Sequence, residues 1–262
     1  MVEYKNIILE RKDRTLIIFL NRPDKLNSLN EELLVELDKV LVEYIEKDDD
    51  MEGFVIAGKG DKAFCAGADI TELAKLTSSS SLEFALKGQR LCSRIENCGK
   101  VSIAAINGFA FGGGLEIALS CSFRFIAETA LVGQPEVKLA IIPGYGGTQR
   151  LLRLVGLARA AEIILSGESL NAQRAYEIGL VNKIVKKESL LEESVNFLKK
   201  IYSNGPYAVK CALRALNWGR NVDIESGLAL EALLFSNTLA TQDAKEGLNA
   251  FLEKRKAQFK NK

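Results

Sequence analysis

Hydrophobic and polar positions along the chain follow two different patterns. Residues 6–20 are apolar on both sides of a polar turn at 12–14, which predicts two strands joined by that turn. From Asn30 to Glu46 the apolar residues recur at helical spacing, with acidic residues near the start. Short apolar runs predict three further buried strands, at 53–58, 101–106 and 123–127.

Helical patterns separate these strands. One covers about 82–97 and another begins at Leu115. Short strands alternating with helices indicate an α/β core with right-handed crossovers. After residue 200 only helical patterns follow, over 209–218, 224–237 and 241–256. We therefore expect a core over residues 1–199 and an all-helical region over 200–262.

The amino-acid composition limits which partners, catalytic groups and metal sites the chain can have. The 262 residues carry a formal net charge of +1, which disfavours a protein whose main partner is nucleic acid or an anionic membrane. Histidine is absent, so any proton transfer rests on other side chains or water, and histidine metal sites are ruled out. The five cysteines are odd in number without Cys-x-x-Cys spacing, and no secretory signal or long apolar run is evident, so we expect reduced thiols and a cytoplasmic location.

Two segments rich in small residues can expose backbone N–H groups. Gly112, Gly113 and Gly114 directly precede a predicted helix, where the backbone can approach an oxyanion or phosphate closely. Residues 63–70 form a second such segment. One N–H from each would make a two-donor oxyanion hole, although each segment is also compatible with a tight turn that binds no ligand. A glycine-rich stretch at 141–150 indicates a ligand loop of unspecified kind.

Two glutamates lie in apolar, glycine-lined segments. Glu116 starts an otherwise apolar helix, and Glu136 ends the segment 133–136. Burial raises the pKa of a carboxyl group, and two such groups in one site push their pKa values apart, which suits acid and base work near neutrality. Both glutamates could also be helix first-turn carboxylates that complement the helix dipole.

Taken together, these segments resemble the enoyl-CoA hydratase/isomerase family, also called the crotonase superfamily. The similarity covers essentially the whole chain, because its motifs occur in the family's order at 21–29, 64–70, 107–116, 134–136, 142–150 and 251–256. It implies a crotonase-like spiral of ββα units and a helical C-terminal trimerisation region. A homotrimer, or a hexamer built from two trimers, is implied as well.

The resemblance also implies a reaction: reversible syn addition of water to a 2-enoyl-CoA thioester. The backbone N–H groups of Ala68 and Gly113 would hold the thioester oxygen, Glu116 would help to activate water, and Glu136 would supply a proton to the substrate. CoA is part of the substrate, and neither a further cofactor nor a metal is expected. The remaining implied substrate-binding residues are Lys25, Leu26, Ser28, Ala66, Asp69, Ile70, Pro135 and Gly144.

The resemblance leaves several members of the family open. Retention of both glutamates favours a hydratase over an enoyl-CoA isomerase. The substrate is either a short straight-chain enoyl-CoA or the branched 3-methylglutaconyl-CoA of leucine breakdown. The chain departs from the family's common pattern at Ser122, where Asp is frequent, and at Val132, where an aromatic residue often stands. RNA binding, reported for some relatives, is disfavoured by an acidic helix over residues 30–46.

Overall fold

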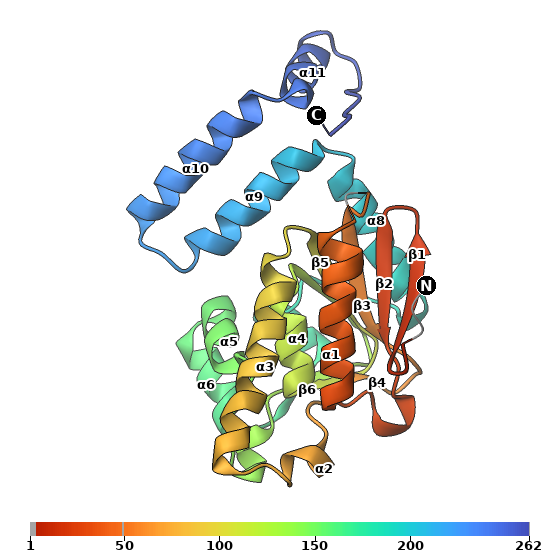
Figure 1. The fold of residues 1–262 in the computed structure, drawn as a ribbon, viewed down its shortest axis with the longest axis vertical. Coiled ribbons are helices and arrows are strands. Elements are labelled where there is room, and N and C mark those ends of the chain that lie inside the picture. The colour runs from red at the N-terminus through yellow and green to blue at the C-terminus, as the bar shows by residue number, and fades with distance from the viewer. Residues whose placement is uncertain (1–3, 49, 262) are drawn as a thin grey trace.

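A computed structural model describes residues 4–48 and 50–261 of the chain (Figure 1). Its main sheet has six strands in the order β1-β2-β3-β5-β7-β10, of which β1 and β2 are antiparallel and the other neighbours parallel. The bounds are β1 Ile7–Lys12, β2 Thr15–Leu20, β3 Gly53–Gly58, β5 Val101–Ile106, β7 Phe123–Ala127 and β10 Lys183–Val185. The predicted hairpin and the three predicted buried strands are confirmed.

A second sheet of four very short strands carries the glycine-rich loops. Its order is β4-β6-β8-β9, with β8 and β9 antiparallel, and its bounds are β4 Ala63–Cys65, β6 Phe109–Phe111, β8 Leu131–Gly133 and β9 Ser169–Asn171. The sequence analysis did not predict these strands. Three residues are too few for either hydrophobic period to show.

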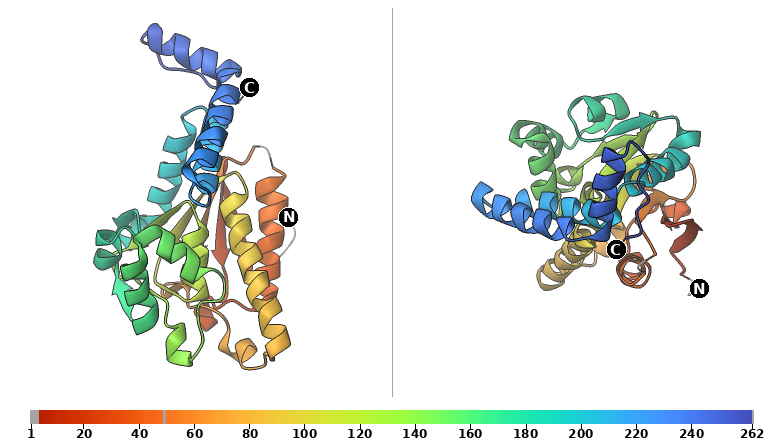
Figure 2. Two further views of the ribbon diagram at one scale, coloured as in Figure 1. Left: turned by 90° about the vertical axis from the view of Figure 1, so that its left-hand side faces the viewer. Right: turned by 90° about the horizontal axis from the view of Figure 1, so that it is seen from above.

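Helices cover the main sheet and connect its strands (Figures 1 and 2). They are α1 Glu31–Val40, which continues as a wider π-type turn over Leu41–Glu46, α2 Ile70–Leu73, α3 Ser78–Asn97, α4 Gly113–Ser120, α5 Gly147–Val155, α6 Leu157–Ser166, α7 Ala172–Glu177 and α8 Leu190–Tyr202. Short 3₁₀ turns span Pro23–Lys25, Glu136–Leu139 and Lys187–Ser189.

Two helices begin earlier than the hydrophobic pattern indicated. α3 starts at Ser78 because the Thr77 side chain and Ser80 form a capping box. α4 starts at Gly113 rather than Leu115, so two of the three glycines are its first residues. This places the glycine run at the positive end of the helix dipole.

The last three helices form an arm that extends from the core: α9 Pro206–Gly219, α10 Ile224–Leu239 and α11 Gln242–Leu252 (Figures 1 and 2). The predicted end of the last helix at residue 256 is wrong, because the helix stops at Leu252 and Lys254 has a φ of 56°. Large apolar side chains are exposed on α10 and α11, namely Ile224, Leu228, Leu233, Phe235, Leu239, Leu248, Phe251 and Leu252. None of the helices within the described residues is long and apolar enough to span a membrane.

Candidate active site

The two small-residue loops meet at the first turn of α4. A Cβ atom on Gly67 would lie 3.6 Å from the Gly113 nitrogen and 3.0 Å from the Phe111 carbonyl oxygen. A Cβ atom on Gly114 would overlap the carbonyl oxygen of Cys65. Glycine at these positions therefore allows the end of β4 to approach the start of α4.

Among the residues that the structure describes, two backbone donors at this junction lack partners. Ala68 forms an isolated parallel bridge with Leu29, in which the Leu29 N–H donates to Gly67 O at 2.8 Å and the Asp69 N–H donates to Leu29 O at 2.9 Å. Because alternate peptide groups of an extended chain face opposite sides, the Ala68 N–H faces away from Leu29. Within the described residues neither this N–H nor that of Gly113, the first residue of α4, donates a hydrogen bond.

Glu116 lies on the first turn of α4 and is only 1% exposed. Its Oε1 accepts hydrogen bonds from the backbone N–H groups of Tyr145, at 2.7 Å, and Gly147, at 2.6 Å. Burial, with a smaller contribution from the nearby Glu136, raises the pKa of Glu116 to about 7, although these hydrogen bonds oppose the shift. This carboxyl group is fixed in orientation and can change protonation near neutral pH.

Glu136 approaches the same turn from the segment that follows β8. It begins the 3₁₀ turn that follows β8, and a Cβ atom on Gly112 would lie 2.9 Å from its Oε1. Gly112 has a φ of 52°, so glycine is needed there both for backbone conformation and for space. Burial also raises the pKa of Glu136 to about 7. Two carboxyl groups of similar acidity thus lie beside one helix terminus.

Gln134 connects the surroundings of these carboxyl groups and was not among the predicted site residues. Its side chain is fully buried. With its amide nitrogen facing Glu136, it donates to Oε1 at 2.9 Å and to Oε2 at 3.1 Å. The amide also lies next to Gly147, whose N–H holds Glu116. Gln134 belongs to the segment 133–136 that carries Glu136, but neither its burial nor its contact with Gly147 could be predicted from the sequence.

The loop that carries Ala68 is held by Arg22, which the sequence analysis gave no role. The guanidinium pairs with Asp69 at 2.9 Å and donates to the Ser28 carbonyl oxygen at 2.6 Å. Asp69 also accepts a hydrogen bond from the Thr71 hydroxyl. The hydrogen bond from Thr71 has the largest effect and the one from Arg22 a smaller effect, and together they keep the pKa of Asp69 below its usual range. Asp69 and Ser28 therefore order the loop through their own protein contacts.

The other predicted substrate-binding residues fall into two groups. Leu26, Ala66, Pro135 and Gly144 are half-buried, and the Ala66 N–H donates to Leu26 O at 3.0 Å. Lys25 and Ile70 are exposed. The Gly144 carbonyl oxygen accepts from the Gln89 side chain at 3.0 Å, which ties the loop after Glu136 to α3.

Gly147→Ala should displace the Glu116 carboxylate. The added Cβ atom would lie 3.0 Å from Glu116 Oε1 and 2.5 Å from the Gln134 amide. Because a misplacement of about 1 Å can cost about 10²-fold in rate, we expect kcat to fall by about that factor. Gly219→Ala is the matched control, since no described atom beyond its chain neighbours and its own helix backbone lies within 4 Å of its Cβ position. Steady-state kinetics of both variants on a 2-enoyl-CoA thioester tests this, and equal kcat values would contradict it.

The fold and the site together define a class of protein: a mixed α/β chain with a helical C-terminal arm, in which two glutamates of raised pKa lie beside two backbone donors that have no partner among the described residues. The model of the enoyl-CoA hydratase/isomerase family matches residues 10–262. The chain belongs to this family.

Named relatives are similar over their full length. The crotonyl-CoA hydratase of Syntrophomonas wolfei is 46% identical over 259 residues, covering 99% of each chain. The short-chain-enoyl-CoA hydratase of Clostridium acetobutylicum is 43% identical over 262 residues, covering 100% of each. The crystal structure of an enoyl-CoA hydratase from Bacillus anthracis matches with a TM-score of 0.94 and 40% identity, covering 98% of this chain and all of the other. The predicted fold and family are confirmed.

Proposed function

We propose that the protein catalyses the reversible syn addition of water to a 2-enoyl-CoA thioester, giving 3-hydroxyacyl-CoA. The observation that carries this proposal is the pair of glutamates with raised pKa beside the Gly113 N–H, which has no acceptor within residues 4–48 and 50–261. Hydration of a conjugated thioester requires a base for water, an acid for the α-carbon and donors for the developing enolate oxygen. The site contains a candidate group for each requirement.

We assign the roles as follows. The backbone N–H groups of Ala68 and Gly113 hold the thioester oxygen, and such a donor typically contributes about 3 kcal/mol in the transition state. Glu116, oriented by two N–H groups, activates water. Glu136 supplies the proton to the α-carbon. No cofactor beyond the CoA of the substrate takes part in this scheme.

The names of the relatives favour a short straight-chain substrate, since two of them are called crotonyl-CoA hydratase and short-chain-enoyl-CoA hydratase. Loss of enoyl-thioester ultraviolet absorbance, measured with crotonyl-CoA and 3-methylglutaconyl-CoA at equal enzyme concentration, tests this. Faster turnover of crotonyl-CoA supports the proposal, and faster turnover of the branched substrate assigns the alternative. If neither substrate is turned over, the protein is not a hydratase for these two substrates, which contradicts the proposal.

For binding of the substrate, including its CoA part, we propose the eight residues that the resemblance implies, and we divide them by the contacts they make. Asp69 and Ser28 act by ordering the loop around Ala68 through Arg22. The exposed Lys25 and Ile70 are available for direct contact. Leu26, Ala66, Pro135 and Gly144 contribute through backbone and loop shape.

The pH dependence of kcat/KM should be bell-shaped with a maximum near pH 7. The mechanism needs one ionised and one protonated glutamate, and burial raises the pKa of both to about 7. Below the maximum the base becomes protonated, and above it the acid loses its proton; the two apparent values belong to the pair. Measurement of kcat/KM for crotonyl-CoA from acidic to alkaline pH tests this. A kcat/KM that does not change with pH around pH 7 would argue against these roles of Glu116 and Glu136.

For assembly and location we propose a homotrimer or a dimer of trimers in the cytoplasm. Residues 1–199 would form the catalytic core and 200–262 the oligomerisation region, supported by the exposed apolar side chains of α10 and α11. The five cysteines are unpaired thiols, which supports a reducing compartment. Nucleic acid and membranes are not proposed as partners. Sedimentation of the full-length protein and of a Phe235→Glu variant tests the assembly, and a monomeric wild type would contradict it.

A further inference from the structure

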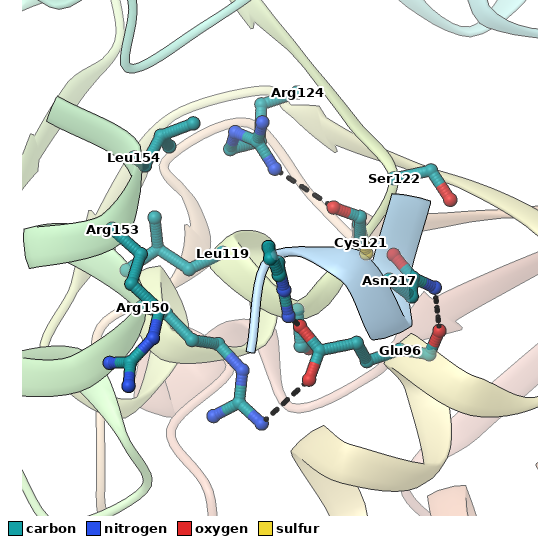
Figure 3. Close-up of a pocket in the computed structure, with 11 residues that line it drawn as sticks. Glu96, Leu119, Cys121, Ser122, Arg124, Arg150, Arg153, Leu154 and Asn217 are labelled. Carbon is teal, nitrogen blue, oxygen red and sulfur yellow. Dashed lines mark hydrogen bonds and ion pairs between the residues drawn. The ribbon is translucent and has the colours of Figure 1, made fainter. Parts of the chain in front are cut away.

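A cavity of about 220 Å³ lies away from the two glutamates, where the arm meets the core (Figure 3). The end of α3, the segment after α4, helix α5 and the end of α9 surround it. Its ionisable lining is dominated by guanidinium groups. These come from Arg124, Arg150, Arg153 and Arg220, and Glu96 is the acidic residue of the lining.

Arg124 is the most deeply buried of these groups, with 5% exposure. Its Nε donates to Leu180 O at 2.8 Å, and its Nη1 donates to Cys121 O at 2.8 Å, just after the end of α4. Carbonyl oxygens at a helix end offset part of the positive charge. Within residues 4–48 and 50–261 no carboxylate forms an ion pair with Arg124. In the part of the chain that the structure describes, a full positive charge therefore lies buried without a negative partner.

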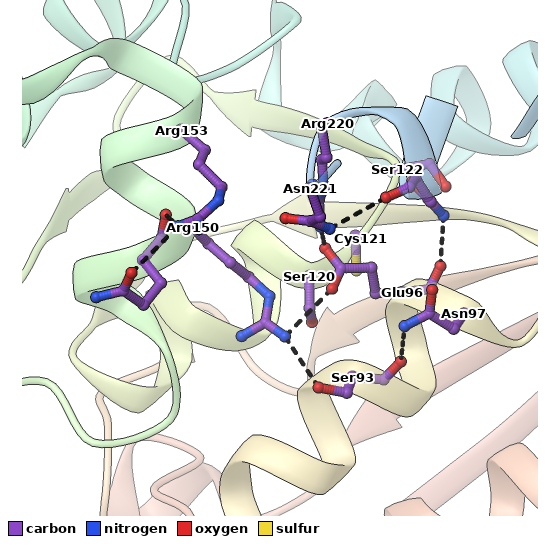
Figure 4. A network of polar contacts seen from close by, with 12 residues as sticks. Ser93, Glu96, Asn97, Ser120, Cys121, Ser122, Arg150, Arg153, Arg220 and Asn221 are labelled. Carbon is purple, nitrogen blue, oxygen red and sulfur yellow. Dashed lines mark hydrogen bonds and ion pairs between the residues drawn. The ribbon is translucent and has the colours of Figure 1, made fainter. Parts of the chain in front are cut away.

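The other charged side chains around the cavity, which belong to the network of polar contacts in Figure 4, also carry more positive than negative charge. Glu96 pairs with Arg150 at 3.3 Å and also with Arg220, so a single carboxylate serves two guanidinium groups. The Arg150 Nε is buried and lacks an acceptor in the described part of the chain. Arg153 donates only to Gln149 there. Four guanidinium groups against one carboxylate leave a surplus of three positive charges around the cavity.

We propose that this cavity binds a small doubly charged oxyanion, either inorganic phosphate or a short dicarboxylate. Guanidinium groups match both anions in geometry, because their planar N–H forks donate in pairs to oxygen atoms. The cavity volume suits a ligand of a few heavy atoms. Such an anion would compensate the buried charge of Arg124 and would join the arm, through Arg220, to α5 of the core.

Isothermal titration calorimetry of the full-length protein, in the assembly it forms in solution, tests the proposal. Sodium phosphate and sodium succinate are titrated separately at constant ionic strength. We expect saturable binding of at least one of them, and the comparison of the two identifies the anion. Absence of saturable binding for both at millimolar concentrations would overturn the proposal, including the case in which a neighbouring copy fills the cavity.

Variants locate any binding that is observed. Arg153→Gln and Arg220→Gln should each weaken it about tenfold, since a hydrogen bond to a charged group contributes free energy of that order. Arg174→Gln, which removes an exposed guanidinium outside the cavity, should leave it unchanged. Thermal melting without added anion confirms that each variant is folded. Equal binding by all three variants would place the anion elsewhere, for example where CoA phosphates bind, and would overturn the proposal.

Discussion

Glu136→Gln should lower kcat for crotonyl-CoA hydration by about 10²- to 10⁴-fold, the range for loss of a positioned general acid or base. The amide has nearly the shape of the acid but cannot donate a proton to carbon at neutral pH. Glu136 is half-buried and its pKa is raised to about 7, so a substantial fraction of it is protonated at neutral pH. Binding should change little, because the substitution leaves the Ala68 and Gly113 donors in place.

The measurement for Glu136→Gln is the steady-state loss of enoyl-thioester absorbance, with the dissociation constant of a non-reactive acyl-CoA determined in parallel. Glu128→Gln is the matched control, because Glu128 is exposed and lies outside the site. Near-normal kcat in Glu136→Gln would remove Glu136 from the mechanism. A large loss of acyl-CoA affinity would instead show that its main role is in binding.

Glu116→Gln should lower activity over the same range while increasing stability. Folding moves the Glu116 carboxyl from a pKa of 4.5 to about 7, so the folded state binds its proton more tightly. Wild-type stability therefore falls as the pH rises from about 4.5 to 7 and stays lower above that. The neutral amide removes this pH dependence. At pH 8 the free energy of unfolding of the variant should therefore exceed that of the wild type by up to roughly 3 kcal/mol, the value for a pKa shift of this size.

Chemical denaturation of wild type and Glu116→Gln at pH 5 and pH 8 tests the stability effect. The advantage of the variant should be large at pH 8 and small at pH 5. The side-chain oxygen of Gln can still accept from the Tyr145 and Gly147 N–H groups, so the loop need not move. A variant less stable than wild type at pH 8 would falsify the assignment of a raised pKa, and normal turnover would contradict the catalytic role.

Much of the main sheet could be predicted from the sequence because β2, β3 and β5 are buried at every position and read as continuous apolar runs. The second sheet could not, because its strands have three residues each and their register depends on partners far along the chain. The start of α3 was missed for a local reason. Its first turn is a run of serines whose capping by Thr77 leaves no hydrophobic period.

The two glutamates were visible because a charge in an apolar, glycine-lined segment is unusual. The groups that orient them were not visible. Glu116 is held by the N–H groups of Tyr145 and Gly147, about thirty residues away, and backbone donors leave no sequence signal. Arg22 and Asp69 are 47 positions apart, and their pairing follows only from the fold. Likewise, the arginines around the basic cavity come from β7, α5 and the segment after α9.

The arm has a consequence for how the protein responds to dilution. Helix α10 packs mainly on α9, and most of its large apolar side chains are exposed, whereas Leu234 is buried. If neighbouring copies cover them, their burial contributes to folding only through association, and melting of the arm is coupled to dissociation of the assembly. Its melting temperature would then rise with protein concentration, whereas a transition confined to the core would stay fixed. A dilute sample would lose the arm first.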